Sequence, residues 1–145
     1  MSPFPVLMED HWVLEPEVDP GRAQLMWFMC LGGEAQAAGL AALGRARMDG
    51  LPGLDLVPSE WLHMTTLIAG YADEMPAGQI ESMTAHAQRV LAAAHPVTIT
   101  LCRVLYHPRA IMLPASPAEA LLPVLAACRE ATRIGTGRVT VPGGF

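Results

Sequence analysis

The segment 79–95 (QIESMTAHAQRVLAAAH) restricts the fold of this chain most strongly, because its apolar residues recur at steps of three and four. The residues on this repeat are Ile80, Met83, Ala87, Val90, Leu91 and Ala94. That spacing places them on one face of an α-helix, and such a face must pack against another element. The chain therefore needs a packed domain in which this helix covers a hydrophobic surface.

Strands and helices are expected to alternate along the rest of the chain. Strands are predicted at 25–31 (LMWFMCL), 61–71 (WLHMTTLIAGY), 97–102 (VTITLC) and 110–113 (AIML), with one further candidate at 138–141. An Ala-rich helix is predicted at 34–48 and ends before Asp49-Gly50. The order predicts an α+β or α/β sandwich in which helices cover a mostly antiparallel or mixed sheet.

A last helix is expected to begin at a capping box. Ser116 would be the N-cap, Pro117 the first helical residue and Glu119 the N3 residue. The helix runs toward Arg133, and Pro123 either kinks it or delays its start. The resulting division is an irregular arm at 1–22, rich in Pro and acidic residues, followed by one domain at 23–145.

The composition is that of a folded protein without a broad basic face. The chain is 52% hydrophobic and 16% charged, which argues against disorder. Its net charge of −5 argues against a surface that grips duplex nucleic acid, although a pocket for one phosphate is compatible with it. Residues 23–44 are long enough to span a bilayer, but Gln24, Glu34 and the turn at Gly32-Gly33 favour a strand followed by a helix.

The cysteines and the N-terminus indicate a cytoplasmic protein. Cys30, Cys102 and Cys128 are odd in number, widely spaced and without a C-x-x-C pair, which favours buried free thiols over disulfides or zinc. The first residues, MSPFPVLMEDHW, have neither a basic start nor a long apolar core, so no signal peptide is expected. No cofactor or metal is predicted.

One strand carries the candidate chemistry. In EWLHMTTL, at 60–67, His63 and Thr65 are two residues apart and project to one face of a strand, whereas Met64 and Thr66 project to the other. A neutral imidazole can take or give a proton near pH 7, and a hydroxyl beside it can donate to a phosphate oxygen. The alternative is a buried histidine whose nitrogens are satisfied by the backbone or by threonine.

The same stretch resembles the first H-x-T motif of the two-histidine phosphoesterases, a superfamily that includes 2′-5′ RNA ligase-like proteins and cyclic phosphodiesterases. The resemblance extends over residues 25–145 through LDLVPSEWLHMTTLIAGYADEM, the helix at 79–95, VTITLC and AIMLPASPAEALLPVLAACREA. It implies two similar lobes around a cleft, and metal-independent acid–base catalysis on a nucleotide or RNA phosphodiester. His63 would then transfer a proton and Thr65 would bind the phosphate.

The chain departs from that family at the second motif. None of His11, His86, His95 and His107 is followed two residues later by Ser or Thr. The stretch VPGGF resembles the segment that precedes the second H-x-T strand in the family, so the expectation is that this strand is missing after Phe145; an alternative alignment places Arg138-Val139-Thr140 there. Catalysis is then expected to be weak or absent, and a noncatalytic relative that binds nucleotides or RNA ends is the alternative.

The other residues that we considered are expected to have mainly structural roles. Trp61 and Tyr71 are expected in the core, with base stacking as the alternative. Thr66 is expected on the far face of its strand, and the methionines in the core. Arg109 and Arg138 are expected to be solvated surface residues, with phosphate contact as the alternative.

Overall fold

The computed structural model describes residues 7–11, 21–101 and 104–138. Within these residues it contains three α-helices, namely α1 (Ala35–Met48), α2 (Ala77–Ala92) and α3 (Leu122–Thr136). The strands are β1 (Gln24–Cys30), β2 (His63–Tyr71), β3 (Thr100–Leu101), β4 (Leu105–His107), β5 (Ala110–Met112) and β6 (Ala115–Ser116). They pair as the antiparallel sheets β1–β2, β3–β6 and β4–β5, which confirms the α+β class at this coarse level.

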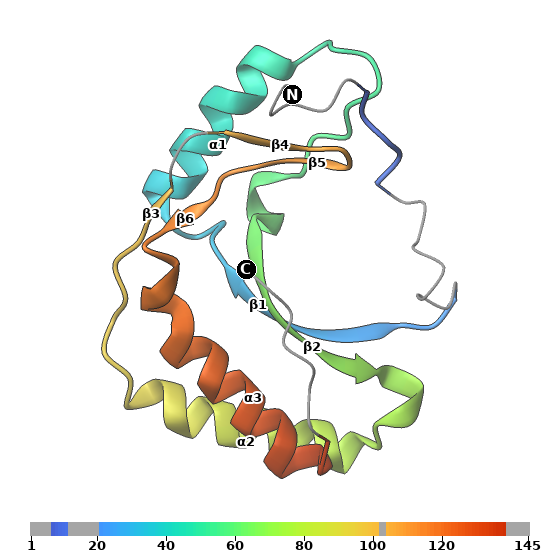
Figure 1. Ribbon diagram of the computed structural model, residues 1–145, viewed down its shortest axis with the longest axis vertical. Coiled ribbons are helices and arrows are strands. Elements are labelled where there is room, and N and C mark those ends of the chain that lie inside the picture. The colour runs from blue at the N-terminus through green and yellow to red at the C-terminus, as the bar shows by residue number, and fades with distance from the viewer. Residues whose placement is uncertain (1–6, 12–20, 102–103, 139–145) are drawn as a thin grey trace.

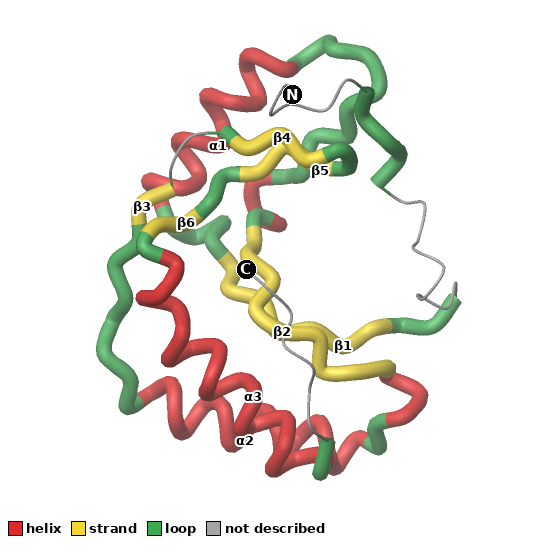
Figure 2. Tube along the Cα trace, in the orientation of Figure 1, coloured by secondary structure: helices red, strands yellow, loops and turns green. Residues whose placement is uncertain are grey.

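The β1–β2 pair is a long bent ribbon through the middle of the molecule (Figure 1). Helices α2 and α3 lie side by side against one face of this ribbon, whereas α1 and the β4–β5 hairpin lie at the other end of the molecule (Figure 2). The short 3-10 helix η1 (Ser59–Trp61) leads into β2. The described residues 7–11 contact the hairpin, since the amide of Glu9 donates to the Pro108 carbonyl at 2.7 Å.

The core lies between the β1–β2 ribbon and the two helices beneath it. One buried cluster combines residues of β2, α2, α3 and the connection between β2 and α2, namely Ala69, Met75, Met83, Ala87 and Ala131. A second cluster joins Leu67 of β2 to Leu125 and Cys128 of α3, and Trp27 of β1 packs against both clusters. The amphipathic helix predicted at 79–95 is therefore confirmed, although Val90 is exposed and Ala94 follows the last helical residue.

Two features fix how closely α3 approaches its neighbours. A Cβ atom added to Gly135 would stand 2.7 Å from the backbone nitrogen of Met83, so only glycine permits this contact between α3 and α2. On the sheet side, the indole Nε1 of Trp27 donates to Thr132 Oγ1 at 3.0 Å, and that hydroxyl donates to the Cys128 carbonyl at 2.8 Å. The hydrogen bonds satisfy the polar atoms of an otherwise apolar contact.

The predicted capping box at Ser116 is wrong. Ser116 belongs to β6, where it pairs with Thr100, so its backbone is extended and already part of a ladder. A 3-10 helix, η3 (Ala118–Leu121), follows without a side-chain cap, and α3 begins at Leu122. Pro123 therefore lies in the first turn of α3 and delays the start of the helix, as one of the two predictions for it stated.

Two predicted strands are shorter or differently placed than expected. Of the strand predicted at 97–102, only Thr100–Leu101 forms a ladder within the described residues. Tyr106 and His107, for which no strand was predicted, belong to β4, and the turn is at Pro108-Arg109. Apart from Arg138, which lies outside any strand, the candidate strand at 138–141 falls outside the described residues.

Residues 23–44 form a strand and a helix, as the sequence favoured, and the helix α1 has no fully buried residue. Among the described residues, no helix is both long enough and apolar enough to cross a bilayer.

Candidate functional site

His63 and Thr65 lie on the face of the β1–β2 ribbon opposite α2 and α3, and both side chains are exposed. The strand register explains this position. Cys30 pairs with His63 and Phe28 pairs with Thr65, so these four side chains share one face. We call this surface the open face.

A β-bulge separates the candidate residues from the core residues of the same strand. In a regular strand His63, Thr65 and Leu67 would share one face. The register shifts between Trp27 and Phe28, which leaves Thr66 as an extra residue on β2. Thr65 is therefore exposed while Thr66 and Leu67 are both buried. The bulge lets one short sequence supply both the open face and the core.

The imidazole of His63 is oriented by two neighbours. Its Nδ1 lies 2.7 Å from the carbonyl oxygen of Trp61, and its ring meets the Phe28 ring edge-on with centroids 4.5 Å apart. A carbonyl oxygen only accepts, so Nδ1 must carry the proton in this hydrogen bond. In the neutral ring the lone pair then resides on Nε2, which is the atom left to accept a proton or a hydrogen bond.

The sequence did not identify Phe28 or the Trp61 carbonyl as parts of the site. Phe28 stands in an apolar run that reads as core, and its role depends on its pairing partner across the ribbon. The strand alternation of 25–30 could have shown that Phe28 and Cys30 share a face, but not which face is open. The bend at η1, which brings the Trp61 carbonyl under His63, has no local sequence pattern.

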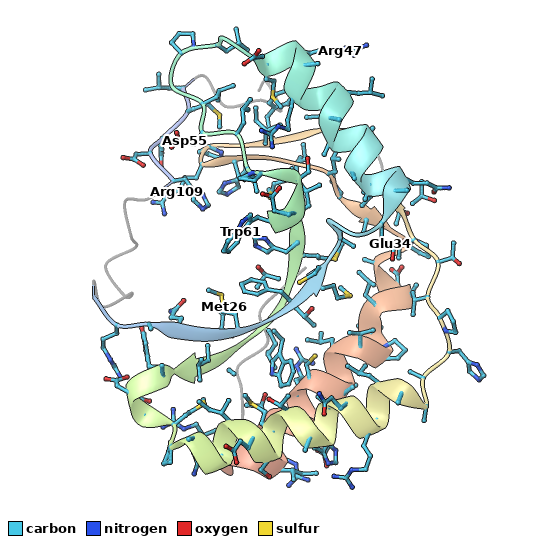
Figure 3. All side chains as sticks on the ribbon, turned by 180° about the vertical axis from the view of Figure 1, so that it is seen from behind. Met26, Glu34, Arg47, Asp55, Trp61 and Arg109 are labelled. Atoms are coloured by element: carbon cyan, nitrogen blue, oxygen red, sulfur yellow. The ribbon has the colours of Figure 1, made fainter. Side chains whose placement is uncertain are left out.

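Trp61 and Cys30 are more exposed than predicted. Trp61 is 69% exposed, so its expected place in the core is wrong. It belongs to η1, which precedes β2 and lies outside the packed region (Figure 3). Cys30 is an exposed free thiol on the open face, whereas Cys128 is buried as predicted and Cys102 lies outside the described residues. Burial raises the pKa of the Cys128 thiol to about 11.

Thr66 and Tyr71 have mainly structural positions. Thr66 is 4% exposed on the covered side, as expected for the far face of its strand, and its hydroxyl has no partner among the residues that the structure describes. Tyr71 is half-buried at the end of β2, and the guanidinium of Arg22 lies over its ring at 3.9 Å from the centroid.

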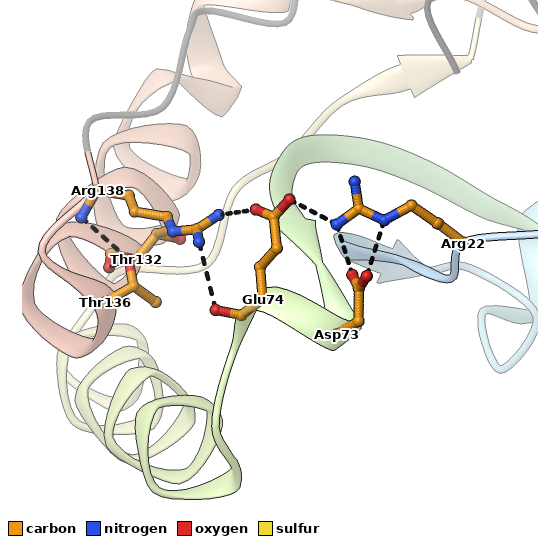
Figure 4. Close-up of polar contacts among 6 residues, drawn as sticks. All are labelled: Arg22, Asp73, Glu74, Thr132, Thr136 and Arg138. Atoms are coloured by element: carbon orange, nitrogen blue, oxygen red, sulfur yellow. Dashed lines mark hydrogen bonds and ion pairs between the residues drawn. The ribbon is translucent and has the colours of Figure 1, made fainter. Parts of the chain in front are cut away.

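The carboxylates after β2 hold two arginines in a network (Figure 4). Arg22 binds both oxygens of Asp73, at 2.9 and 2.6 Å, and also contacts Glu74. Glu74 bridges to Arg138, which follows α3, at 2.6 Å. The hydrogen bonds from Arg22 lower the pKa of Asp73, and those from Arg22 and Arg138 lower the pKa of Glu74. Arg138 is thus paired with an acidic side chain rather than freely solvated.

The other candidate residues lie outside the β1–β2 ribbon. Arg109 is in the turn of the β4–β5 hairpin, where its Nε lies 3.3 Å from a carboxylate oxygen of Glu9 and its carbonyl lies 3.1 Å from His11 Nδ1. The amide of Arg109 donates to His107 Nδ1 at 3.3 Å. Within residues 7–11, 21–101 and 104–138, no group of three or more His, Cys, Asp or Glu side chains could hold a metal ion.

No protein-family model, curated protein or solved structure matches this chain. The geometry of the site is therefore the basis for the functional proposal below.

Proposed function

We propose that the open face binds a phosphodiester and that His63 and Thr65 carry its chemistry, in the manner of the two-histidine phosphoesterases. The observation that carries this proposal is the exposed pair itself, with the His63 Nδ1 proton held by the Trp61 carbonyl. The remaining lone pair on Nε2 is then the group that accepts a proton. The same proposal includes that this chain has the two-lobed fold of that superfamily.

The reaction that best fits this pair is opening of a 2′,3′-cyclic phosphate, or cleavage of a 2′-5′ bond, without a metal. The Thr65 hydroxyl donates to a non-bridging phosphate oxygen. His63 Nε2 accepts a proton from the attacking water as the new P–O bond forms, and the leaving alkoxide takes a proton from a second acid. Within residues 1–145, H-x-[ST] occurs once, so solvent is the acid available to this chain. A missing general acid costs on the order of 10²–10⁴ in rate, and we expect slow turnover.

Hydrolysis of a 2′,3′-cyclic mononucleotide tests the proposal. The chain is compared with His63→Ala and Thr65→Val, and His95→Ala serves as a control because His95 is exposed and lies beyond the end of α2. We expect slow turnover in the parent and the control, and a loss of at least about a hundredfold in His63→Ala, the lower end of the range for removing a general base. Thr65→Val should lose at least about tenfold, because it removes one hydrogen bond to a charged phosphate oxygen.

Binding measured alongside turnover separates the two candidate functions. Binding that depends on His63 and Thr65, without any turnover, would favour the noncatalytic nucleotide-binding protein. Binding and turnover that persist in both site variants would contradict the proposal. Circular dichroism of each variant establishes that the fold is intact.

A further inference from the structure

Large apolar side chains surround the candidate site on the open face. Met26 is 38% exposed, Phe28 44% and Ile68 48%, and Met26 pairs directly with Ile68 in the ladder. The next pair on the same face is Phe28 with Thr65, followed by Cys30 with His63. Met26, Phe28 and Ile68 thus lie along the ladder on the same face as His63 and Thr65. The exposed Trp61 lies on the same side of the ribbon as Met26 in Figure 3, and its carbonyl contacts His63. We call Met26, Phe28, Ile68 and Trp61 the apolar patch.

The two strands that form the open face contribute no arginine or lysine to it. Neither β1 (QLMWFMC) nor β2 (HMTTLIAGY) contains an arginine, and the chain has no lysine. Arg22 and Arg138, at the far end of the ribbon, are bound by Asp73 and Glu74. Arg47 lies on α1, away from Met26 and Trp61 in Figure 3. Arg109 lies nearer to Trp61 in that view, in the β4–β5 hairpin, and its guanidinium forms an ion pair with the carboxylate of Glu9 at 3.3 Å. The net charge of the chain is −5.

These two properties select a different ligand from the polynucleotide that the family resemblance suggests. A single-stranded nucleic acid is held mainly by cations that neutralise successive phosphates. The open face offers polar groups for one phosphate and apolar surface beside it. Apolar surface gains free energy by covering an apolar or aromatic group, and it gains nothing from a second phosphate.

We propose that the open face takes a small phosphodiester that carries at least one aromatic or aliphatic group, and that it excludes polynucleotide chains. This inference rests on the proposed function, because it uses His63 and Thr65 as the phosphate site. The apolar patch determines affinity for the substituent, while His63 and Thr65 determine affinity for the phosphate.

Three probes test this assignment by NMR titration of the complete chain: diphenyl phosphate, dimethyl phosphate and a single-stranded RNA of 12 nucleotides. We expect diphenyl phosphate to bind at least about tenfold more tightly than dimethyl phosphate, since burying a phenyl ring on the apolar patch supplies the difference. The shifted signals should include the His63 ring and the Thr65 amide. The salt dependence should correspond to one phosphate, with a slope no steeper than about −1.

Two variants replace half of the apolar patch without changing His63 or Thr65. Met26→Thr and Ile68→Thr should reduce the preference for diphenyl phosphate to about threefold or less and leave dimethyl phosphate unchanged. Leu43→Thr is the matched control, because Leu43 is an exposed apolar residue on α1. Its preference for diphenyl phosphate over dimethyl phosphate should equal that of the parent.

The outcomes distinguish this inference from the proposed function. If both small phosphates bind through His63 but equally well, the phosphate site stands and the apolar patch does not select the ligand. If neither binds through His63, both proposals fail. Tighter binding of the RNA, with a slope steeper than about −2, would overturn the exclusion of polynucleotides. Sedimentation that shows dimers, lost in Ile68→Thr, would assign the apolar patch to a second copy of the chain instead.

Discussion

The two faces of the β1–β2 ribbon are built from the same strands and differ in almost every other respect. The covered face presents Trp27 and Leu67 to α2 and α3, and its one indole N–H is satisfied by Thr132. The open face presents Phe28, Thr65 and His63 to solvent. Adjacent residues of one strand therefore serve separate purposes, with stability on one side and candidate chemistry on the other.

This contrast shows what a local sequence pattern leaves undetermined. Thr65 and Thr66 are identical residues, yet one is exposed and the other is 4% exposed. The difference arises from a single extra residue in the pairing, because a bulge changes the phase of the strand. Substitutions on the covered face should accordingly affect unfolding, whereas those on the open face should affect ligand binding if the proposed function holds.

The largest expected difference is between two neighbours on β2. Leu67 is 1% exposed and Ile68 is 48% exposed. Leu67→Ala should lower the free energy of unfolding by about 2–5 kcal/mol, because it leaves a cavity against α3. Ile68→Ala should lower it by less than about 1 kcal/mol. Urea denaturation measures both values, and equal costs would contradict the division into a covered and an open face.

The glycine contact between α2 and α3 provides a second test. Gly135→Ala should destabilise the protein by about 1–3 kcal/mol, because the added methyl group overlaps the backbone of Met83. Gly39→Ala in α1 is the control, since no atom lies within 4 Å of its new Cβ. This control should stabilise by about 0.5–1 kcal/mol, as helical Gly-to-Ala changes do in open positions. Thermal melts of both variants show whether each substitution raises or lowers the stability.

Removal of the polar anchor in the covered face should have an intermediate effect. Thr132→Val keeps the shape of the side chain but leaves the Trp27 indole N–H without its acceptor. We expect a loss of about 1–3 kcal/mol in unfolding free energy. In the double variant Trp27→Phe/Thr132→Val, the second substitution should cost less than it does alone. Additive costs would show that the hydrogen bond contributes nothing.

The smallest effect should come from the ion network at the end of the ribbon. The pKa values of Asp73 and Glu74 are lowered in the folded state, from reference values of 3.8 and 4.5. A lowered folded pKa means that the stabilisation is complete above these reference values and is lost as pH falls through the folded ones. The melting temperature of Asp73→Asn/Glu74→Gln should therefore approach that of the parent as the pH falls below 4.5 and then below 3.8. A difference in melting temperature between the parent and the variant that stays constant with pH would show that the ionised carboxylates do not cause it.

Much of the coarse fold could be predicted from the sequence. The helix at 79–95 was predictable because its apolar face repeats at helical spacing, and Met83 and Ala87 are buried as that repeat requires. The strand at 25–31 was predictable because apolar strand formers end at a Gly-Gly turn. His63 and Thr65 were predictable as a pair, since strand alternation requires them to share a face.

The remainder depended on contacts between distant segments. The extended backbone of Ser116 reflects its ladder with Thr100, which overrides a good local capping signal. The exposure of Trp61 reflects the position of η1 outside the core, whereas large aromatic residues are usually buried. Neither the bulge at Thr66 nor the contact between Phe28 and His63 has a local pattern, because both depend on the register between two strands.

The two indoles on either side of the ribbon give the protein its own optical reporters. Trp27 is half-buried and hydrogen-bonded in the covered face, so its fluorescence should follow unfolding. Trp61 is open to solvent beside His63, so its emission should respond to soluble quenchers and to a molecule that settles on the open face. With Trp12 replaced by phenylalanine, one emission spectrum would report folding and occupancy separately, without any attached dye.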